Sequence, residues 1–301
     1  SHRGALPTMT EKEKALESDL RRDVGRLAGE FARRNTDDPE VLQAAAAFLE
    51  ASLVESGFSP QRQTYPASGV ECANLEVEIP GSAKPKEIVI VGAHYDSVHG
   101  CPAANDNGSG TAATLALAKA FAGKKPSRTL RFVLFVNEEP PHFQTDRMGS
   151  VVYAKRCKER GETITAMLSL ETIGYYSDRK GSQKYPFPFN WFYPSEGNFV
   201  GFVGNFASRG LVRDSIRSFR THAKFPSEGV AAWGAIPGLG WSDHWAFWQE
   251  GYPAIMVTDT APYRYPHYHE PTDTPDKIDF ARTDRVVAGL EKVIADLAGL
   301  E

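Results

Sequence analysis

The 301-residue sequence contains only three cysteines, Cys72, Cys101 and Cys157. Three cysteines are too few for a disulfide scaffold, and none of them has the Cys-x-x-Cys spacing of a redox motif or a structural zinc site. Either all three are free thiols or, if the protein is exported, Cys72 and Cys101 form a bridge. The low cysteine content therefore argues against a disulfide-rich secreted module.

Long apolar runs and an excess of basic charge are also absent. No apolar stretch approaches the ~20 residues that a membrane-spanning helix needs. The 34 basic and 38 acidic residues give a formal net charge of -4, so nothing indicates binding to nucleic acid or to an anionic membrane. No signal peptide is visible. A secreted or periplasmic location is favoured over a cytoplasmic one, and the oligomeric state is left open.

Two catalytic signatures are missing as well. No Gly-x-Ser-x-Gly elbow for a nucleophilic serine occurs in the sequence. The Gly-rich turn at residues 108–110 could hold a phosphate between a strand and a helix. It lacks, however, the Gly-Lys-Ser/Thr ending of a P-loop and the spacing of a dinucleotide fingerprint. These absences disfavour serine-nucleophile and nucleotide-binding functions.

The remaining pattern alternates helices with apolar strands. Amphipathic helices are predicted over residues 11–34 and 39–56, the second capped by Asp37 and Asp38. The alternation predicts one α/β domain over residues 1–301, with the helices of residues 1–57 packed on it. The architecture is a three-layer α/β/α sandwich with a mainly parallel mixed central sheet. Strands are predicted at 61–65, 73–79, 88–93, 130–136, 164–170, 198–203 and 254–257, and further helices at 110–122, 149–160, 206–220, 243–249 and 280–298.

Two adjacent carboxylates, Glu138 and Glu139, directly follow the apolar run of residues 130–136 and Asn137. Buried carboxylates are costly unless something positive meets them, and a metal ion is the favoured partner. Since successive strand residues point to opposite sides, one Glu can ligate a metal while the other acts as a base for hydrolysis. The alternative interpretation is a solvated acidic strand end.

Other strand ends carry further ligand types. His94 and Glu171 each end an apolar run, and Asp106 precedes a helix of small residues. Asp96 shares a strand face with His94 and can orient its imidazole. His269 lies near the C-terminus. Nitrogen and oxygen ligands without thiolates suit Zn²⁺, with Co²⁺ or Mn²⁺ as substitutes.

Together, these segments resemble the co-catalytic dizinc exopeptidases. That family includes bacterial leucyl aminopeptidases, vacuolar-type aminopeptidases, glutamate carboxypeptidase II and glutaminyl cyclase. The resemblance extends from about Cys72 to the C-terminus and implies the zinc exopeptidase fold, which is phosphorylase/hydrolase-like. The matching motifs are His94-Tyr95-Asp96-Ser97, Asp106-Asn107-Gly108-Ser109-Gly110, Asn137-Glu138-Glu139, Ser242-Asp243-His244, and Tyr268-His269 with Asp273-Thr274.

The resemblance implies two Zn²⁺ ions that share Asp106 as a bridging ligand. His94 and Glu171 complete one set of ligands, and Glu139 and His269 complete the other. A shared carboxylate offsets the repulsion between two ions ~3.5–4 Å apart. The family more often has Asp where this chain has Glu171, and the longer arm could alter the coordination or affinity of that ion.

The resemblance also implies roles for residues that do not ligate. Glu138 is the expected general base and Tyr268 the expected stabiliser of the oxyanion. Asp96 and Asp243 are expected to support the ligands from behind, and the peptide bond after Asp106 is expected to be cis.

Two features fall outside the motifs. The aromatic, proline-rich segment 185–194 is predicted to be a loop, either packed onto its own domain or walling an apolar pocket for a substrate side chain. His244 is interpreted as a residue that faces the ligands or the substrate, with core packing as the alternative.

The expected function is hydrolysis of N-terminal residues from peptides by a zinc-dependent aminopeptidase, a metalloprotease of the exopeptidase class. The partners are peptide substrates with a free N-terminus, because the motifs hold many carboxylates and no Arg or Lys to receive a C-terminal carboxylate. The alternatives are a glutaminyl-peptide cyclotransferase on the same fold or a carboxypeptidase-type member. A non-catalytic binding domain that kept the fold is a further alternative, which metal analysis would separate from an enzyme.

Overall fold

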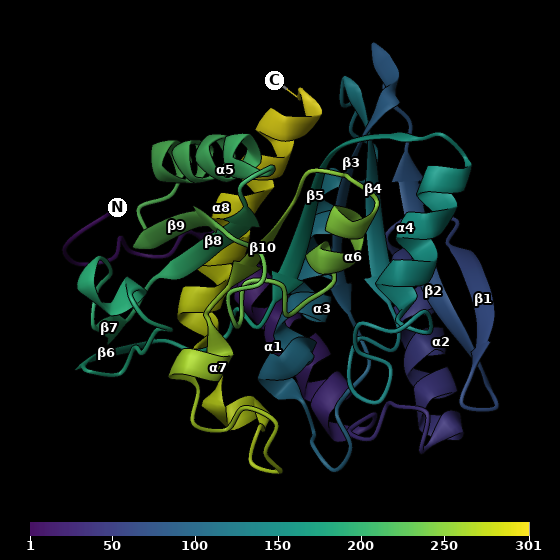
Figure 1. Cartoon of the computed structure of the whole chain (residues 1–301), viewed down its shortest axis with the longest axis horizontal. Helices are drawn as coiled ribbons and strands as arrows, with labels where there is room; N and C mark the ends of the chain where they lie inside the picture. Colours follow the sequence, from purple (N-terminus) through teal and green to yellow (C-terminus); the bar gives the residue numbers. More distant parts are fainter. Residues whose placement is uncertain (301) are drawn as a thin grey trace.

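The computed structural model describes residues 1–300, and its centre is a mixed sheet of eight strands in the order β1-β2-β4-β3-β5-β10-β8-β9 (Figure 1). The four central strands, β4, β3, β5 and β10, run parallel, whereas β1, β2 and β8 join antiparallel neighbours and β9 runs parallel to β8. The strands are β1 Gln61–Ala67, β2 Val70–Ile79, β3 Lys84–His94, β4 Arg128–Phe135, β5 Thr163–Glu171, β8 Val200–Asn205, β9 Ser227–Ala232 and β10 Ala254–Thr258.

Helices cover both faces of this sheet (Figure 1). One face carries the larger core and five helices, and the other carries a smaller core and two helices. The first set is α1 Glu11–Gly29, α2 Pro39–Glu55, α3 Gly110–Phe121, α5 Arg209–His222 and α8 Phe280–Ala298, and the second is α4 Gly149–Glu159 and α6 His244–Gln249. The predicted three-layer α/β/α sandwich with a mainly parallel mixed sheet is therefore confirmed.

Smaller elements lie between these. The short strands β6 Ser177–Lys180 and β7 Glu196–Gly197 form a separate two-stranded sheet, and α7 Ala261–Arg264 is a single turn. Short helical turns at Ala104–Ser109, Phe189–Trp191 and Pro275–Lys277 complete the set. None of the helices within residues 1–300 is both long and apolar enough to cross a membrane.

Local sequence explains where the long helices begin and end. Thr10 and Glu13 form a reciprocal capping box at the start of α1, which satisfies backbone N–H groups that have no partner within the helix. Asp279 caps α8 by accepting a hydrogen bond from the backbone of Arg282, and Gly299 ends that helix in the left-handed conformation at φ 67°, which costs glycine nothing.

One sequence prediction about the N-terminal region is wrong, and another is confirmed in position only. The helix predicted over residues 11–34 ends at Gly29, because the chain turns there and carries Arg34 into the core. Asp38 occupies the N-cap of α2 but makes no capping hydrogen bond. Its carboxylate instead lies 3.0 Å from the guanidinium of Arg33. Both helices, α1 and α2, contribute to the larger core.

All three cysteines are free and buried. Cys72 lies on β2, and the thiol of Cys101 donates to the backbone carbonyl of Glu270 at 3.1 Å. The structure therefore has free thiols rather than a bridge between Cys72 and Cys101.

Candidate metal centre

The predicted ligands come from five chain segments that converge at the carboxyl ends of the central parallel strands. His94 is the last residue of β3 and Glu171 the last residue of β5. Glu139 follows the end of β4, Asp106 lies in the turn before α3, and His269 lies in the loop between α7 and α8. Parallel strands deliver these side chains to one place because their carboxyl ends share one edge of the sheet.

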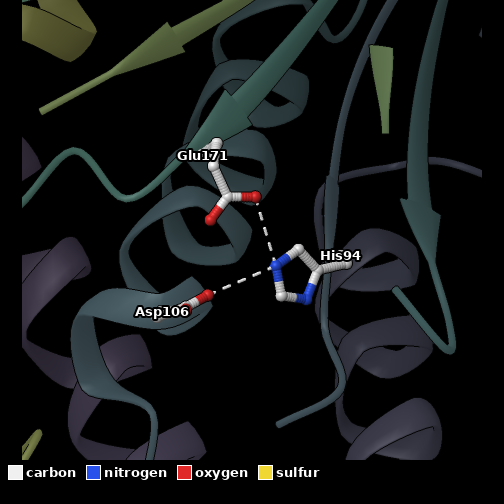
Figure 2. A group of neighbouring side chains, drawn as sticks. All are labelled: His94, Asp106 and Glu171. Carbon is white, nitrogen blue, oxygen red and sulfur yellow. Dashed lines mark ion pairs between the residues drawn. The ribbon is translucent and has the colours of Figure 1, made fainter. Parts of the chain in front are cut away.

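Figure 2 shows the first group, in which Nε2 of His94 faces two carboxylates. This nitrogen lies 3.4 Å from Oδ1 of Asp106 and 3.2 Å from Oε2 of Glu171. In the second group, Nε2 of His269 lies 3.0 Å from Oδ2 of Asp106 and 3.3 Å from Oε2 of Glu139. The two carboxylate oxygens of Asp106 thus face different histidines.

These distances fit the spacing of metal ligands. Zinc bonds of ~2.0–2.1 Å at tetrahedral angles place two ligand atoms ~3.3 Å apart. Both ring nitrogens of His94, Oδ1 of Asp106 and Oε1 of Glu139 are buried, and within residues 1–300 none of them has a hydrogen-bond partner. Buried polar atoms rarely stay without partners, so the donor set fits a bound cation.

The charges of the cluster support the same conclusion. Burial raises the pKa of Glu138 well above its usual range, and it raises that of Glu171 as well. Burial and the charge of Asp106 together raise the pKa of Glu139 to about 8. Burial lowers the pKa of His269, but its contacts with Asp106 and Glu139 outweigh this effect and raise it to about 10. The burial of several carboxylates in one place thus favours a neutralising cation.

Asp96 lies directly behind the ligands. Oδ1 of Asp96 is 3.4 Å from Nδ1 of His94. The same carboxylate accepts hydrogen bonds from the backbone N–H groups of Glu138 and Glu139, both at 3.1 Å. Asp96 therefore lies against the imidazole of His94 and fixes the backbone of the two adjacent glutamates.

Asp243 lies at the start of α6 and is fully buried. Neither of its carboxylate oxygens has a hydrogen-bond partner in the described part of the chain. Burial raises its pKa to about 7, and the charge of His94 opposes this shift. Asp243 thus adds a buried acid next to the cluster without belonging to either ligand group.

Sequence reasoning assigned no role to two residues that position the ligands. The hydroxyl of Ser242 donates to Oε2 of Glu171 at 2.6 Å. Asp273 accepts hydrogen bonds from the backbone N–H groups of Asn105 and Asp106, at 2.9 and 3.1 Å. Both residues lie within the motifs that resemble the family, and this was the only sign in the sequence that they have a role. The peptide bond between Asp106 and Asn107 is cis.

The remaining predicted residues separate into two environments. The ring of Tyr268 stacks on His269 with centroids 3.9 Å apart, and Tyr268 lines the cavity beside the cluster. His244 instead lies 2.6 Å from the carbonyl of Leu239 and packs edge-on against Trp248. The interpretation of His244 as facing the ligands or the substrate is therefore wrong, because its ring is part of the packing around α6.

An open cavity adjoins the cluster and is lined by Glu171 and Tyr268 among others. Apolar side chains of the sheet, Val203 and Met256 among them, form part of its wall. The aromatic loop forms another part, so residues 185–194 wall a pocket. The residues of this loop that line the cavity are Tyr185, Pro186, Phe189 and Tyr193.

Arg34 connects the N-terminal helices to the loops that carry the ligands. The side chain is fully buried. Its guanidinium donates to the carbonyls of Tyr95 at 2.6 Å and Ala103 at 2.7 Å, next to His94 and close to Asp106. It also donates to the carbonyls of Leu27, Phe31 and Pro102. Arg34 thus holds two loops of the metal centre against the end of α1.

Replacement of Arg34 by Met is expected to lower the free energy of unfolding by about 3 kcal/mol or more, because several buried carbonyls lose their donor. Replacement of the adjacent Arg33, whose side chain is 73% exposed, is expected to cost at most about 1 kcal/mol. Urea unfolding of both variants measures the difference. If the two variants unfold at the same midpoint urea concentration, Arg34 does not make this contribution to stability.

The fold and the cluster together define a metal-dependent hydrolase. The model of peptidase family M28 matches residues 74–294, and the chain belongs to this family. The resemblance noted in the sequence is thereby confirmed, and the chain is a metallopeptidase.

Individual comparisons agree with this assignment. The chain is 34% identical over 280 residues to YfbL, an uncharacterized protein of Escherichia coli strain K12, covering 90% of this chain and 85% of the relative. It spans about half the length of the curated leucine aminopeptidases that it matches.

Two solved structures have the same fold at low sequence identity. The LapA aminopeptidase of Legionella pneumophila has a TM-score of 0.71 at 17% identity, covering 99% of this chain and 78% of that one. A glutaminyl cyclase of Porphyromonas gingivalis has a TM-score of 0.70 at 18% identity, covering 93% and 98%. At this identity the likeness concerns the fold alone.

Proposed function

We propose that the protein is a zinc aminopeptidase that binds two zinc ions and removes N-terminal residues from peptides. The observation that carries the proposal is the position of Asp106, whose two carboxylate oxygens face two different histidines. His94 and Glu171 hold one ion with Asp106, and Glu139 and His269 hold the other. The family and its curated leucine aminopeptidases support the choice of reaction.

When bound, zinc supplies the Lewis acidity that activates a water molecule and polarises the scissile carbonyl. Glu138 belongs to neither group that contains Asp106, although it forms a third candidate group with His94 and Glu139, and its Oε2 lies 3.6 Å from Nε2 of His94. It removes a proton from the attacking water and returns that proton to the nitrogen of the leaving amine. The hydroxyl of Tyr268, at the cavity wall, donates a hydrogen bond to the oxyanion.

The proposal requires a substrate with a free α-amine. The cluster contains four buried carboxylates, those of Asp106, Glu138, Glu139 and Glu171, and Glu171 also lines the cavity that receives the substrate. The negative field of these groups attracts a cationic N-terminus and repels a substrate carboxylate. The substrate's first residue therefore lies with its amine at Glu171 and its side chain in the cavity.

Acetylation of the N-terminus is expected to remove most of the turnover of a good peptide substrate, because the amide carries no positive charge. The measurement compares release of the first residue from matched free and acetylated peptides by zinc-loaded protein. Equal rates, or release of C-terminal residues first, would contradict aminopeptidase action and leave the hydrolase assignment in place.

The second candidate function is glutaminyl cyclisation, which the fold shared with the Porphyromonas gingivalis enzyme supports. The two reactions give different products from a peptide that begins with glutamine. An aminopeptidase releases free glutamine and a peptide one residue shorter, whereas a cyclase releases ammonia and leaves the chain length unchanged. Mass spectrometry of the products separates them.

A further inference from the structure

The cavity beside the metal centre follows one row of residues across the sheet. Glu171 on β5 pairs with Thr258 on β10, Thr258 pairs with Gly201 on β8, and Gly201 pairs with Glu228 on β9. All four residues line the cavity. Since neighbouring strands lie ~4.8 Å apart, the backbone positions of Glu171 and Glu228 are about 14 Å apart. The cavity therefore runs from a proposed metal ligand to a second carboxylate.

Gly201 keeps the middle of this row open. A Cβ atom placed at Gly201 would make only ordinary contacts, the nearest being the backbone oxygen of Thr258 at 3.4 Å. The backbone thus tolerates a side chain at this position, and the space above Gly201 belongs to the cavity. A long substrate side chain can lie over Gly201, whereas a larger residue there would shorten the pocket.

Aromatic rings cover the far part of the row. Tyr185 and Tyr193 lie with ring centroids 5.7 Å apart. Their hydroxyls donate to the backbone carbonyls of Pro194 and Gly229, at 2.6 and 2.9 Å. Because backbone carbonyls occupy these hydroxyls, the tyrosines offer ring faces and edges to the cavity. Such rings suit apolar side chains and also attract cations.

Glu228 is the carboxylate at the far end, and its side chain is 25% exposed. Its nearest cationic atom is Nη2 of Arg220 on α5, at 3.8 Å, and that guanidinium already donates to Ser227 at 2.6 Å. Arg220 does not line the cavity; the cation that does is Lys184, which has an exposed side chain and makes no ion pair within residues 1–300. The carboxylate of Glu228 makes no hydrogen bond in that part of the chain, so it can accept one from a ligand.

We propose that Glu228 selects substrates whose N-terminal residue has a long side chain ending in a positive charge, namely arginine and lysine. The methylene stem of such a residue lies over Gly201 between the sheet and the tyrosine rings, and its cation meets the carboxylate of Glu228. Leucine is too short to reach this carboxylate. The inference rests on the proposed aminopeptidase function and assigns the specificity of the same site.

The test compares aminoacyl substrates with Arg, Lys, Leu, Phe or Ala at the N-terminus, using the full chain loaded with zinc. In the unchanged protein, kcat/KM for Arg and Lys is expected to exceed that for Leu. Glu228→Gln is expected to lower kcat/KM for Arg and Lys about tenfold, mostly by raising KM, because a charge-assisted hydrogen bond is lost. Its values for Leu and Phe should stay within about twofold, since their side chains make no such bond.

Two further variants test the effects of charge and of pocket length separately. Glu196→Gln makes the same charge change on β7, outside the cavity lining, and is expected to leave all five substrates unchanged. Gly201→Leu fills the middle of the row and is expected to reduce turnover of the Arg, Lys and Phe substrates while sparing the Ala substrate.

If Glu228→Gln lowers kcat/KM equally for Arg and Leu, or if kcat/KM for Leu exceeds that for Arg in the unchanged protein, the selection by Glu228 is refuted. If no aminoacyl substrate is cleaved at all, the aminopeptidase function itself fails.

Discussion

Glu138→Gln is expected to lower kcat by about 10²–10⁴-fold, the usual contribution of general acid–base catalysis. The amide cannot take a proton from water at neutral pH, and it cannot return one to the leaving amine. Bound zinc is expected to be retained, because His94 and Glu171 complete one group around Asp106 and His269 and Glu139 complete the other. Glu138 belongs to neither of these two groups. Elemental analysis and kcat measured on the same preparation test both parts of this result.

The adjacent Glu139→Gln is the matched control for this experiment. Glu139 lies 3.3 Å from Nε2 of His269, so its replacement is expected to weaken zinc binding. If Glu138→Gln loses zinc and Glu139→Gln keeps it, the roles of the two glutamates are reversed.

Asp106→Asn is expected to weaken both zinc sites at once, because the carboxylate is shared and its charge offsets the repulsion between the two ions. Zinc content after reconstitution should fall from about two ions per chain to less than one. Asp146→Asn changes a carboxylate that is 75% exposed and lies outside the ligand groups, and it is expected to keep both ions. A reconstituted wild-type protein with less than one zinc per folded chain would refute the two-ion site.

The carboxyl ends of β3, β4 and β5 could be predicted because each apolar run is followed by a residue type that can ligate a metal ion or transfer a proton. A buried strand needs apolar side chains on both faces, so the change to His94, Glu138 or Glu171 is visible in the sequence. The motifs also place Asp106, Glu139 and His269 in order along the chain, and the structure brings all six residues together in overlapping groups. Their roles as ligands and base remain predictions.

Other features could not be predicted from local pattern. The strand β9 was missed because Ser227–Ala232 is rich in small residues and lies at the sheet edge, where burial imposes little hydrophobic pattern. Arg34 gives no signal as a core residue, since its burial depends on carbonyls from distant segments. His244 was misjudged because a motif shows which residues are near in sequence and not which way a ring points.

The dispersal of the ligands along the chain has a consequence for biosynthesis. The first proposed ligand is His94 and the last is His269, 175 residues further along the chain. During synthesis His269 is the last of the proposed ligands to emerge, so the site that contains it cannot form before the segments that carry the other ligands are present. Zinc bound as proposed adds to the stability of the folded protein by mass action, because the unfolded chain offers no assembled site. The free energy of unfolding is therefore expected to rise with the concentration of free zinc.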